Sequence, residues 1–265
     1  RFEKVSLSRG DCTINSYYIN DEDRRGAQEA ADHAASLMSY HEKRFGKYPY
    51  RVFSIVPAYL GHGGDQSSGL IFIDTRMYRL PKFLFRYFDF LVSHETGHQW
   101  FYNIVGSDEY TEMFMDEGMN SYWTLRYLEN SYGYNAKVLV LPKWLQWMLP
   151  NFTFRDSTVS RYVFLAKNGY DRAVVGALSD FKEPSSIFAF AYGKGASVLM
   201  MLESALGKDI FDGIVERYTK EYRFRNFSVA DLERITAEES GKNVSGFFSQ
   251  WLMTDKKCDF RVRSV

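Results

Sequence analysis

The sequence predicts an α+β fold, in which a strand-rich first part precedes a mostly helical remainder. Three observations support this prediction. Segments of alternating polarity fall before residue 82, segments with helical spacing follow it, and neither an internal repeat nor a low-complexity stretch interrupts the chain. We therefore expect a small mixed β-sheet lobe over residues 1–82 and a mostly helical lobe over residues 83–257.

The first part is predicted to combine strands with one long helix. Residues 1–20 alternate loosely and indicate strands, whereas apolar residues at helical spacing predict a helix over 24–45. Residues 51–56 form a further predicted strand between two prolines. A glycine-rich loop, 61–69, then leads into a short apolar strand over 70–73, which could pair with an extended peptide at the edge of a sheet.

The remainder is predicted to be helical. Residues 82–105 are apolar nearly all round, so this helix should be buried on most sides. A second helix is expected over 112–128. Ser228, with Asp231 three residues on, has the pattern of a capping box. Further helices are expected over 196–206, 208–221, 229–239 and 244–253.

The composition argues against several classes of protein. Hydrophobic residues make up 45% and charged residues 25% of the chain, as in an ordinary globular protein. The 33 basic and 33 acidic residues balance, so nothing favours nucleic acid or an anionic membrane as a partner. The two cysteines cannot build a disulfide framework. No apolar run approaches the length of a membrane span, so we expect no transmembrane segment.

Both ends of the chain resemble cuts through a longer polypeptide. The chain begins at Arg1 rather than at a methionine. It ends in an alternating segment, 258–265, which we expect to be the start of a strand leading out of the domain. Other domains of a longer parent protein are therefore expected as partners.

The segment HETGHQW places His94 and His98 four residues apart, with Glu95 directly after the first histidine. On a helix the two imidazoles lie about 40° apart and can converge on one metal ion, while the carboxylate points towards the open side of that ion. This pattern is typical of a zinc site with its own general base. The alternative is a pair of core histidines on one buried helix.

A catalytic zinc ion needs three protein ligands, and no third histidine follows at a metal-binding spacing. The next predicted helix, over 112–128, carries Asp116 and Glu117 in an apolar context. An unpaired carboxylate would be costly to bury there, and a metal ion would compensate that cost. From the residues alone, a solvated position for Glu117 stays open.

Eighteen residues, 99 to 116, separate His98 from Glu117. This spacing, with HETGHQWFYNIV before it and MDEGMNSYW after it, resembles the gluzincins of the aminopeptidase N and leukotriene hydrolase family of zinc metallopeptidases. The resemblance implies a zinc ion, one per chain, held by His94, His98 and Glu117, with Glu95 as the general base. It also implies a thermolysin-like catalytic domain over residues 1–265, with the zinc site between the two lobes.

The resemblance extends over nearly the whole chain. The segment YGKGASVL, 192–199, resembles a family motif whose tyrosine stabilises an oxyanion, which implies this role for Tyr192. Taken alone, such a tyrosine could equally be a packing residue at the start of a helix. FGKYPY resembles the run that precedes the family's substrate-edge strand, and FFSQW resembles a run near the end of the family's catalytic domain. The chain departs from the family at Tyr102, in place of glycine, and at Asp116, in place of asparagine; neither is a ligand.

A further departure concerns the recognition of a peptide's free N-terminus. The family carries a glutamate that binds the α-ammonium group, and alignment on the following Gly-Leu pair puts Gln66 at that position. An amide brings no charge, and a charge-assisted hydrogen bond is roughly twice as strong as a neutral one. Gln66, Asp65, Gly63 and Gly64 are the candidate substrate-binding residues. Asp65 could take over by a shift of the loop, another domain could supply a carboxylate, or the segment could be a polar surface loop.

The sequence thus predicts a zinc metallopeptidase that acts on peptide substrates and, in the first place, an aminopeptidase. Glu95 would take the proton from a zinc-activated water, and Tyr192 would stabilise the oxyanion. One alternative is a related zinc peptidase without strict specificity for a free N-terminus. Another, from a different class, is a non-catalytic scaffold of the same fold, which would be expected to have lost ligands.

Overall fold

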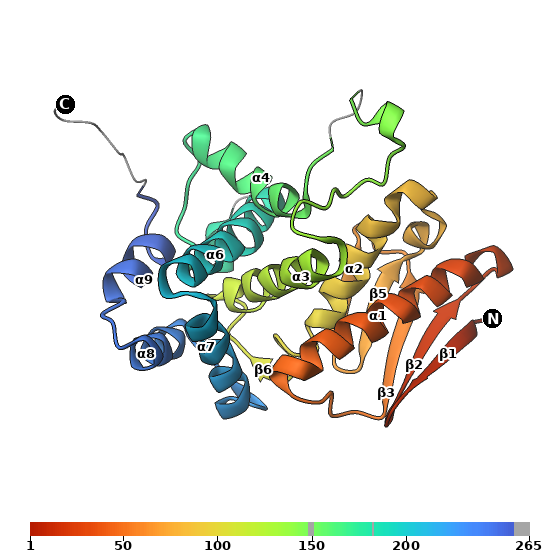
Figure 1. The fold of residues 1–265 in the computed structure, drawn as a ribbon, viewed down its shortest axis with the longest axis horizontal. Helices are drawn as coiled ribbons and strands as arrows, with labels where there is room; N and C mark the ends of the chain where they lie inside the picture. Colours follow the sequence, from red (N-terminus) through yellow and green to blue (C-terminus); the bar gives the residue numbers. More distant parts are fainter. Residues whose placement is uncertain (148–150, 182, 257–265) are drawn as a thin grey trace.

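The computed structural model describes residues 1–147, 151–181 and 183–256, and the predicted strand at 258–265 lies outside these residues. The α+β class is confirmed, because one sheet is built from the first part of the chain and helices follow. Figure 1 shows this sheet at one end of the molecule, α7–α9 at the other end and α3 near the centre.

The sheet is mixed, as predicted. Its order is β1-β2-β3-β5-β4; β1 and β2 form an antiparallel hairpin, β2, β3 and β5 run parallel, and β4 closes the sheet antiparallel to β5. The strands are β1 Glu3–Arg9, β2 Cys12–Tyr18, β3 Val52–Ala58, β4 Gly64–Ser67 and β5 Leu70–Asp74. The helix α1, Arg24–Phe45, makes the crossover from β2 to β3 and packs on the sheet, as a parallel pair requires.

The glycine-rich loop contains a strand that we did not predict. Residues 64–67 form β4, so β5 is hydrogen-bonded on both sides and the sheet edge belongs to β4. The expectation that the strand over 70–73 offers the edge was therefore wrong. The cause is the tight turn at Ser68 and Gly69, where Gly69 has a φ of 74°, a value that suits glycine.

The remainder of the chain is helical, apart from the two-residue strands β6, Val105–Gly106, and β7, Arg225–Asn226, which pair in parallel. Short 3₁₀ turns and a π-helical segment, η7, join the α-helices. The helical elements are α2 Phe85–Gly97, α3 Glu117–Tyr132, α4 Phe154–Lys167, α5 Pro184–Ile187, η7 Phe188–Lys194, α6 Gly195–Leu206, α7 Lys208–Glu221, α8 Val229–Ser240 and α9 Ser245–Leu252. The capping box of Ser228 and Asp231 is confirmed.

The helix predicted over 82–105 is shorter than expected. It ends at Gly97, because the side-chain amide and the backbone N–H of Asn103 both donate to the carbonyl of His98, at 2.8 and 3.0 Å, and turn the chain. Tyr102 then takes a φ of 112°, which is rare for a residue other than glycine. The chain therefore leaves the α2 axis directly after the second histidine.

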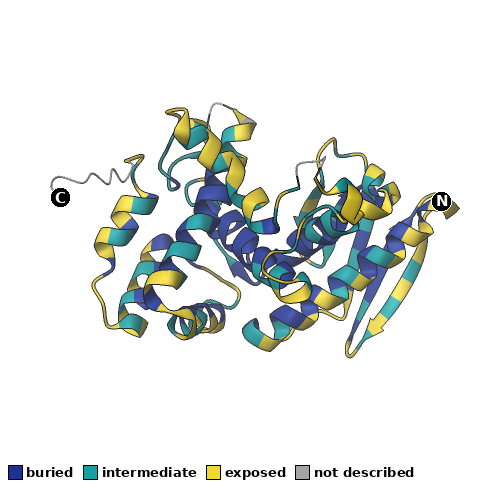
Figure 2. Cartoon of the chain, turned by 45° about the horizontal axis from the view of Figure 1, so that its top comes forward, coloured by how far each residue is buried: buried dark blue, intermediate teal, exposed yellow. Residues whose placement is uncertain are grey.

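The core runs through the middle of the molecule, where Figure 2 shows the buried residues concentrated in the central helices. Most of α3 is buried, and it packs against α2, α4 and α6. The helix α2 in turn contacts α1 and the strands β4 and β5. The segment that carries HETGHQW is thus held between the sheet and the helical part.

One stretch, Ser185–Leu206, has the length and composition of a membrane span, with a mean hydropathy of 1.3. The expectation that no apolar run approaches that length was therefore wrong. In this fold 56% of the stretch is buried, and it packs on α3 and α4. Core helices share this character, so the stretch alone does not indicate a membrane span.

Candidate metal centre

His94, His98 and Glu117 come together from two helices. His94 lies on α2, His98 directly follows its last residue, and Glu117 is the first residue of α3. His94 Nε2 and His98 Nε2 lie 3.2 and 3.4 Å from the same oxygen, Glu117 Oε2. All three side chains are buried, and their possible ligand atoms lie within 4.8 Å of one another.

This group fits a zinc ion. Ligand bonds of about 2.0–2.1 Å in a tetrahedron put the ligand atoms about 3.3–3.4 Å apart, close to the separations found here. His98 Nε2 has no hydrogen-bond partner among the described residues, although it is buried. A buried ring nitrogen without a partner is costly, and a metal ion would supply one once it displaces the proton.

Two further residues contact this group: Asp116, directly before α3, and Asn120, within α3. Asp116 Oδ1 lies 2.6 Å from His98 Nδ1, which turns the other ring nitrogen towards Glu117. Asn120 donates from its side chain to the backbone carbonyl of His94, at 2.7 Å. Both polar contacts are buried, so they hold the two histidines in a defined orientation.

The charges in this group depend on one another. Burial lowers the pKa of His98, but the carboxylates of Asp116 and Glu117 outweigh burial and hold that pKa well above its usual range. Burial raises the pKa of Glu117, yet His98 and His94 bring it far below normal. For Asp116 burial prevails and raises the pKa to about 7. A metal ion would displace the proton of His98, since only the neutral ring binds metal.

Glu95 is buried next to the group and faces the sheet edge. Burial raises its pKa to about 8, and the negative charges of Glu117, Asp65 and Asp116 add to the effect against the opposing influence of His98. The strand β4 passes very close, because a Cβ added at Gly64 would lie 2.8 Å from Glu95 Oε1. A larger residue at that position would displace the Glu95 side chain.

Tyr192 lies on the other side, in η7. Its ring stacks on the ring of His94, with centroids 5.7 Å apart and planes at 22°. Burial, and then the carboxylate of Glu117, raise the pKa of Tyr192 above its ordinary value, so the hydroxyl keeps its proton. The tyrosine is thus a hydrogen-bond donor beside the candidate metal ligands.

The four residues predicted to bind substrate lie at the start of β4 or within it. Gly63 packs against Leu91 of α2, and Gly64 packs against Glu95. Asp65 is exposed and accepts from the backbone N–H of Gln66, at 2.9 Å, while Gln66 is half-buried. Of these two, Asp65 is the one whose charge raises the pKa of Glu95.

Three supporting residues were missed by sequence reasoning. Besides Asp116 and Asn120, Gln99 joins the end of α2 to the β4–β5 turn, accepting from Gly69 N and donating to Ser67 O, both at 2.9 Å. Each of the three lies within three residues of a predicted ligand. Their polar side chains in an apolar context were the available indication.

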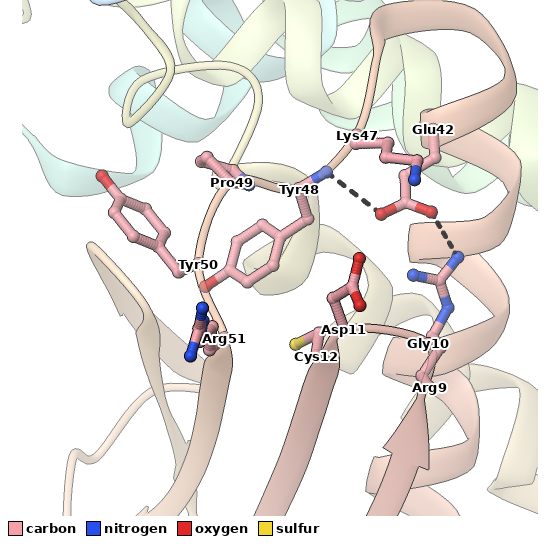
Figure 3. Close-up of a pocket in the computed structure, with 10 residues that line it drawn as sticks. All are labelled: Arg9, Gly10, Asp11, Cys12, Glu42, Lys47, Tyr48, Pro49, Tyr50 and Arg51. Atoms are coloured by element: carbon pink, nitrogen blue, oxygen red, sulfur yellow. Dashed lines mark hydrogen bonds and ion pairs between the residues drawn. The ribbon is translucent and has the colours of Figure 1, made fainter.

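A pocket of about 810 Å³ lies elsewhere, where the β1–β2 turn meets the segment between α1 and β3. Figure 3 shows its polar lining, with Glu42 bonded to Arg9 and to the backbone of Tyr48. It contains no residue of the metal group. We therefore give it no part in the chemistry.

The site has the residue set of a zinc-dependent hydrolase. It combines two histidines one helical turn apart, a carboxylate that completes the group, and a buried glutamate beside them. Residues 29–251 match the peptidase family M1 domain. The chain therefore belongs to this family, which confirms the predicted resemblance. The predicted zinc cofactor is confirmed with it, since the chain belongs to this family and His94, His98 and Glu117 form a group able to hold a metal ion.

The relatives are aminopeptidases of greater length. Aminopeptidase M1-B of Oryza sativa subsp. japonica is 32% identical over 163 residues, 60% of this chain and 17% of that protein. Aminopeptidase 2, mitochondrial, of Saccharomyces cerevisiae is 27% identical over 256 residues, 94% of this chain and 25% of that protein. This chain thus spans a quarter or less of either relative.

An M1 zinc metallopeptidase from Deinococcus radiodurans has the same fold, with a TM-score of 0.68. The match covers 98% of this chain and 52% of that one, at 17% sequence identity. At this identity the likeness concerns the fold alone.

Proposed function

We propose that this chain is the catalytic domain of a zinc-dependent peptidase that removes amino acids from the N-termini of peptides. The observation that carries the proposal is the convergence of His94, His98 and Glu117, whose ligand atoms have the spacing that zinc requires. The aminopeptidase relatives support the reaction class.

His94, His98 and Glu117 would hold the metal ion. When bound, zinc supplies Lewis-acid chemistry, which lowers the pKa of a water and polarises a carbonyl group. Glu95 acts as the general base, taking a proton from the attacking water and passing it to the leaving amine. Its buried position supports this role, because a pKa near neutrality suits a group that both accepts and returns a proton.

Tyr192 stabilises the negative charge that develops on the carbonyl oxygen of the substrate. Its stacking on His94 brings the phenol beside the metal ligands, and its raised pKa keeps the hydroxyl a donor. The ring is half-buried, so water competes for this hydrogen bond less than it would at a fully exposed position.

The edge strand β4 receives the peptide, with Gly63 and Gly64 allowing its backbone to lie against α2. We assign the contact with the free ammonium group to Asp65 rather than to Gln66. Asp65 carries the charge that such a contact needs, and that charge acts on Glu95. A peptidase with relaxed end-recognition is the second candidate, favoured by the neutral Gln66.

The two candidates differ in how they treat a blocked substrate. We would measure kcat/KM of the zinc-loaded protein on amino-acid amides with a free and with an acetylated amine, in the native protein and in the variants D65N and Q66L. An aminopeptidase anchored by Asp65 prefers the free amine, and D65N reduces that preference about tenfold or more, whereas Q66L does not. Equal rates on both substrates would exclude the aminopeptidase and leave the zinc peptidase.

A further inference from the structure

Lys194, the last residue of η7, buries a charged ammonium group close to the candidate site. Its side chain is 2% exposed. Lys194 Nζ lies 2.9 Å from Asp171 Oδ1, 2.5 Å from the carbonyl of Arg172 and 3.3 Å from the carbonyl of Thr254. A lysine ammonium has three N–H donors, so each of them has an acceptor.

These acceptors come from two distant segments. Asp171 and Arg172 lie in the loop after α4, and Thr254 follows α9. The two segments are joined independently, because the backbone N–H groups of Val174 and Val175 both donate to the carbonyl of Leu252. Lys194 therefore joins the end of η7 to two segments, the loop after α4 and the residues after α9, that are already bonded to each other.

Tyr192 is turned to the opposite side of the same segment. Residues advance by about 100° each along an α-helix, and by somewhat less in the wider π-helix, so side chains two positions apart face nearly opposite directions. Lys194 accordingly meets Asp171, while Tyr192 stacks on His94 with ring centroids 5.7 Å apart. A rotation of η7 about its axis would move both side chains at once.

The segment η7 also packs on its neighbours, because the buried Phe190 ring contacts the rings of Tyr162 and Phe181, with centroids 6.2 and 6.4 Å apart. A Cβ added at Gly193 would lie 3.1 Å from the carbonyl oxygen of Thr158, and one at Gly195, the first residue of α6, would lie 3.1 Å from the Cα of Gly118. Such close backbone contacts have no preferred direction. The hydrogen bonds of the ammonium group are directional, and they act at the end of the segment.

We propose that Lys194 is a positioning residue that sets the rotation of η7 and thereby holds the Tyr192 ring against His94. This inference rests on the proposed role of Tyr192 in catalysis. Replacing an ion pair by apolar residues is often neutral for stability. The hydrogen bonds of Lys194 therefore serve to orient η7 rather than to stabilise the fold.

A double-mutant cycle between K194M and Y192F tests the proposal. K194M is expected to lower kcat about 10- to 100-fold with little change in KM, because the hydroxyl is displaced while the substrate still binds. In the Y192F background the same substitution is expected to change kcat by less than about twofold, since no hydroxyl remains to be positioned. Zinc content should stay at that of the native protein. Equal losses in both backgrounds would overturn the proposal.

A crystal structure of K194M gives a second measurement that does not need activity. The Tyr192 ring should leave its stacked position on His94, with and without zinc, and an unmoved ring would also overturn the proposal. If K194M does not fold, D171N goes through the same cycle, because it weakens one acceptor and keeps the lysine. If the native domain hydrolyses no peptide, the proposed function fails, while the ring position still decides the inference.

The matched control is E129Q. Glu129 forms a partly buried ion pair with Arg155 between α3 and α4, at 2.8 Å, and lies outside η7. Losing it should destabilise the fold without coupling to Y192F. If E129Q shows the same coupling as K194M, the effect is a general loss of packing and the specific role of Lys194 is refuted.

Discussion

The helix α2 carries two buried carboxylates, which differ in their hydrogen bonding. Asp89, 1% exposed, accepts from Ser93 at 2.8 Å and from Tyr132 at 2.6 Å, and it lies 3.2 Å from His33 Nδ1. Glu95, 5% exposed, makes no side-chain hydrogen bond within residues 1–147, 151–181 and 183–256. The first carboxylate is fully bonded and joins α1, α2 and α3, whereas the second is left free to react.

This difference shows how one helix can serve both structure and chemistry. A bonded carboxylate contributes to stability, because breaking its contacts leaves buried groups unpaired. An unbonded one is costly to bury, and the cost appears as the raised pKa of Glu95. Such an arrangement is retained where the group has a task that hydrogen bonds would obstruct.

The strongest test of the comparison is E95Q. This variant should keep one zinc ion per chain and lose about 10²- to 10⁴-fold in kcat/KM, because the amide cannot accept the proton. Its unfolding free energy should equal or exceed that of the native protein, since a poorly solvated carboxylate has been removed. Metal analysis, steady-state kinetics and denaturant unfolding check the three points. Full activity of E95Q would refute Glu95 as the base.

The counterpart is D89N, for which the expected loss is in stability. An amide at this position presents N–H groups to neighbours that also donate, so we expect a loss of about 1–3 kcal/mol in unfolding free energy. The rate per zinc-loaded molecule should be unchanged. Y132F serves as the control and should lose less, because it removes one donor only. A variant D89N as stable as the native protein would show that Asp89 is not structural.

The smallest expected effect concerns Asp116. Like Asp89 it contacts a histidine, but this histidine belongs to the metal group. D116N should weaken zinc binding about tenfold, the lower end of the range for such supporting residues, because the amide oxygen still accepts from His98. Competition with a chelator measures this, and D89N should bind zinc like the native protein. If D116N and D89N bind zinc equally well, Asp116 has no special part in the centre.

Much of the fold was predictable because it depends on local patterns. The helix α1 has the predicted bounds, and α6 to α9 lie within a residue or two of their predicted ranges. Local spacing also predicted the metal group, since His94 and His98 share one helical face. Glu117 required a resemblance, because nothing in a single helix tells which carboxylate of a neighbouring helix will face the histidines.

What could not be predicted depends on contacts between distant residues. The β4–β5 turn is bonded on both sides by Gln99, which lies thirty residues further along the chain and which no local pattern links to it. The network around Asp89 joins residues 33, 89 and 132, which no local pattern links. The π-helical form of η7 was not predicted either; here Gly193 packs closely against α4, and Gly195, the next residue but one, packs against α3.

The open edge of β4 has a consequence for solubility. An unpaired strand edge that can accept a peptide can equally accept the edge of a second protein molecule, and such pairing starts aggregation. Here the exposed edge is only four residues long and carries the charge of Asp65 on its solvent face. Shortness and charge are common protections of sheet edges, so the residue assigned to hold a peptide's N-terminus also keeps copies of this protein apart.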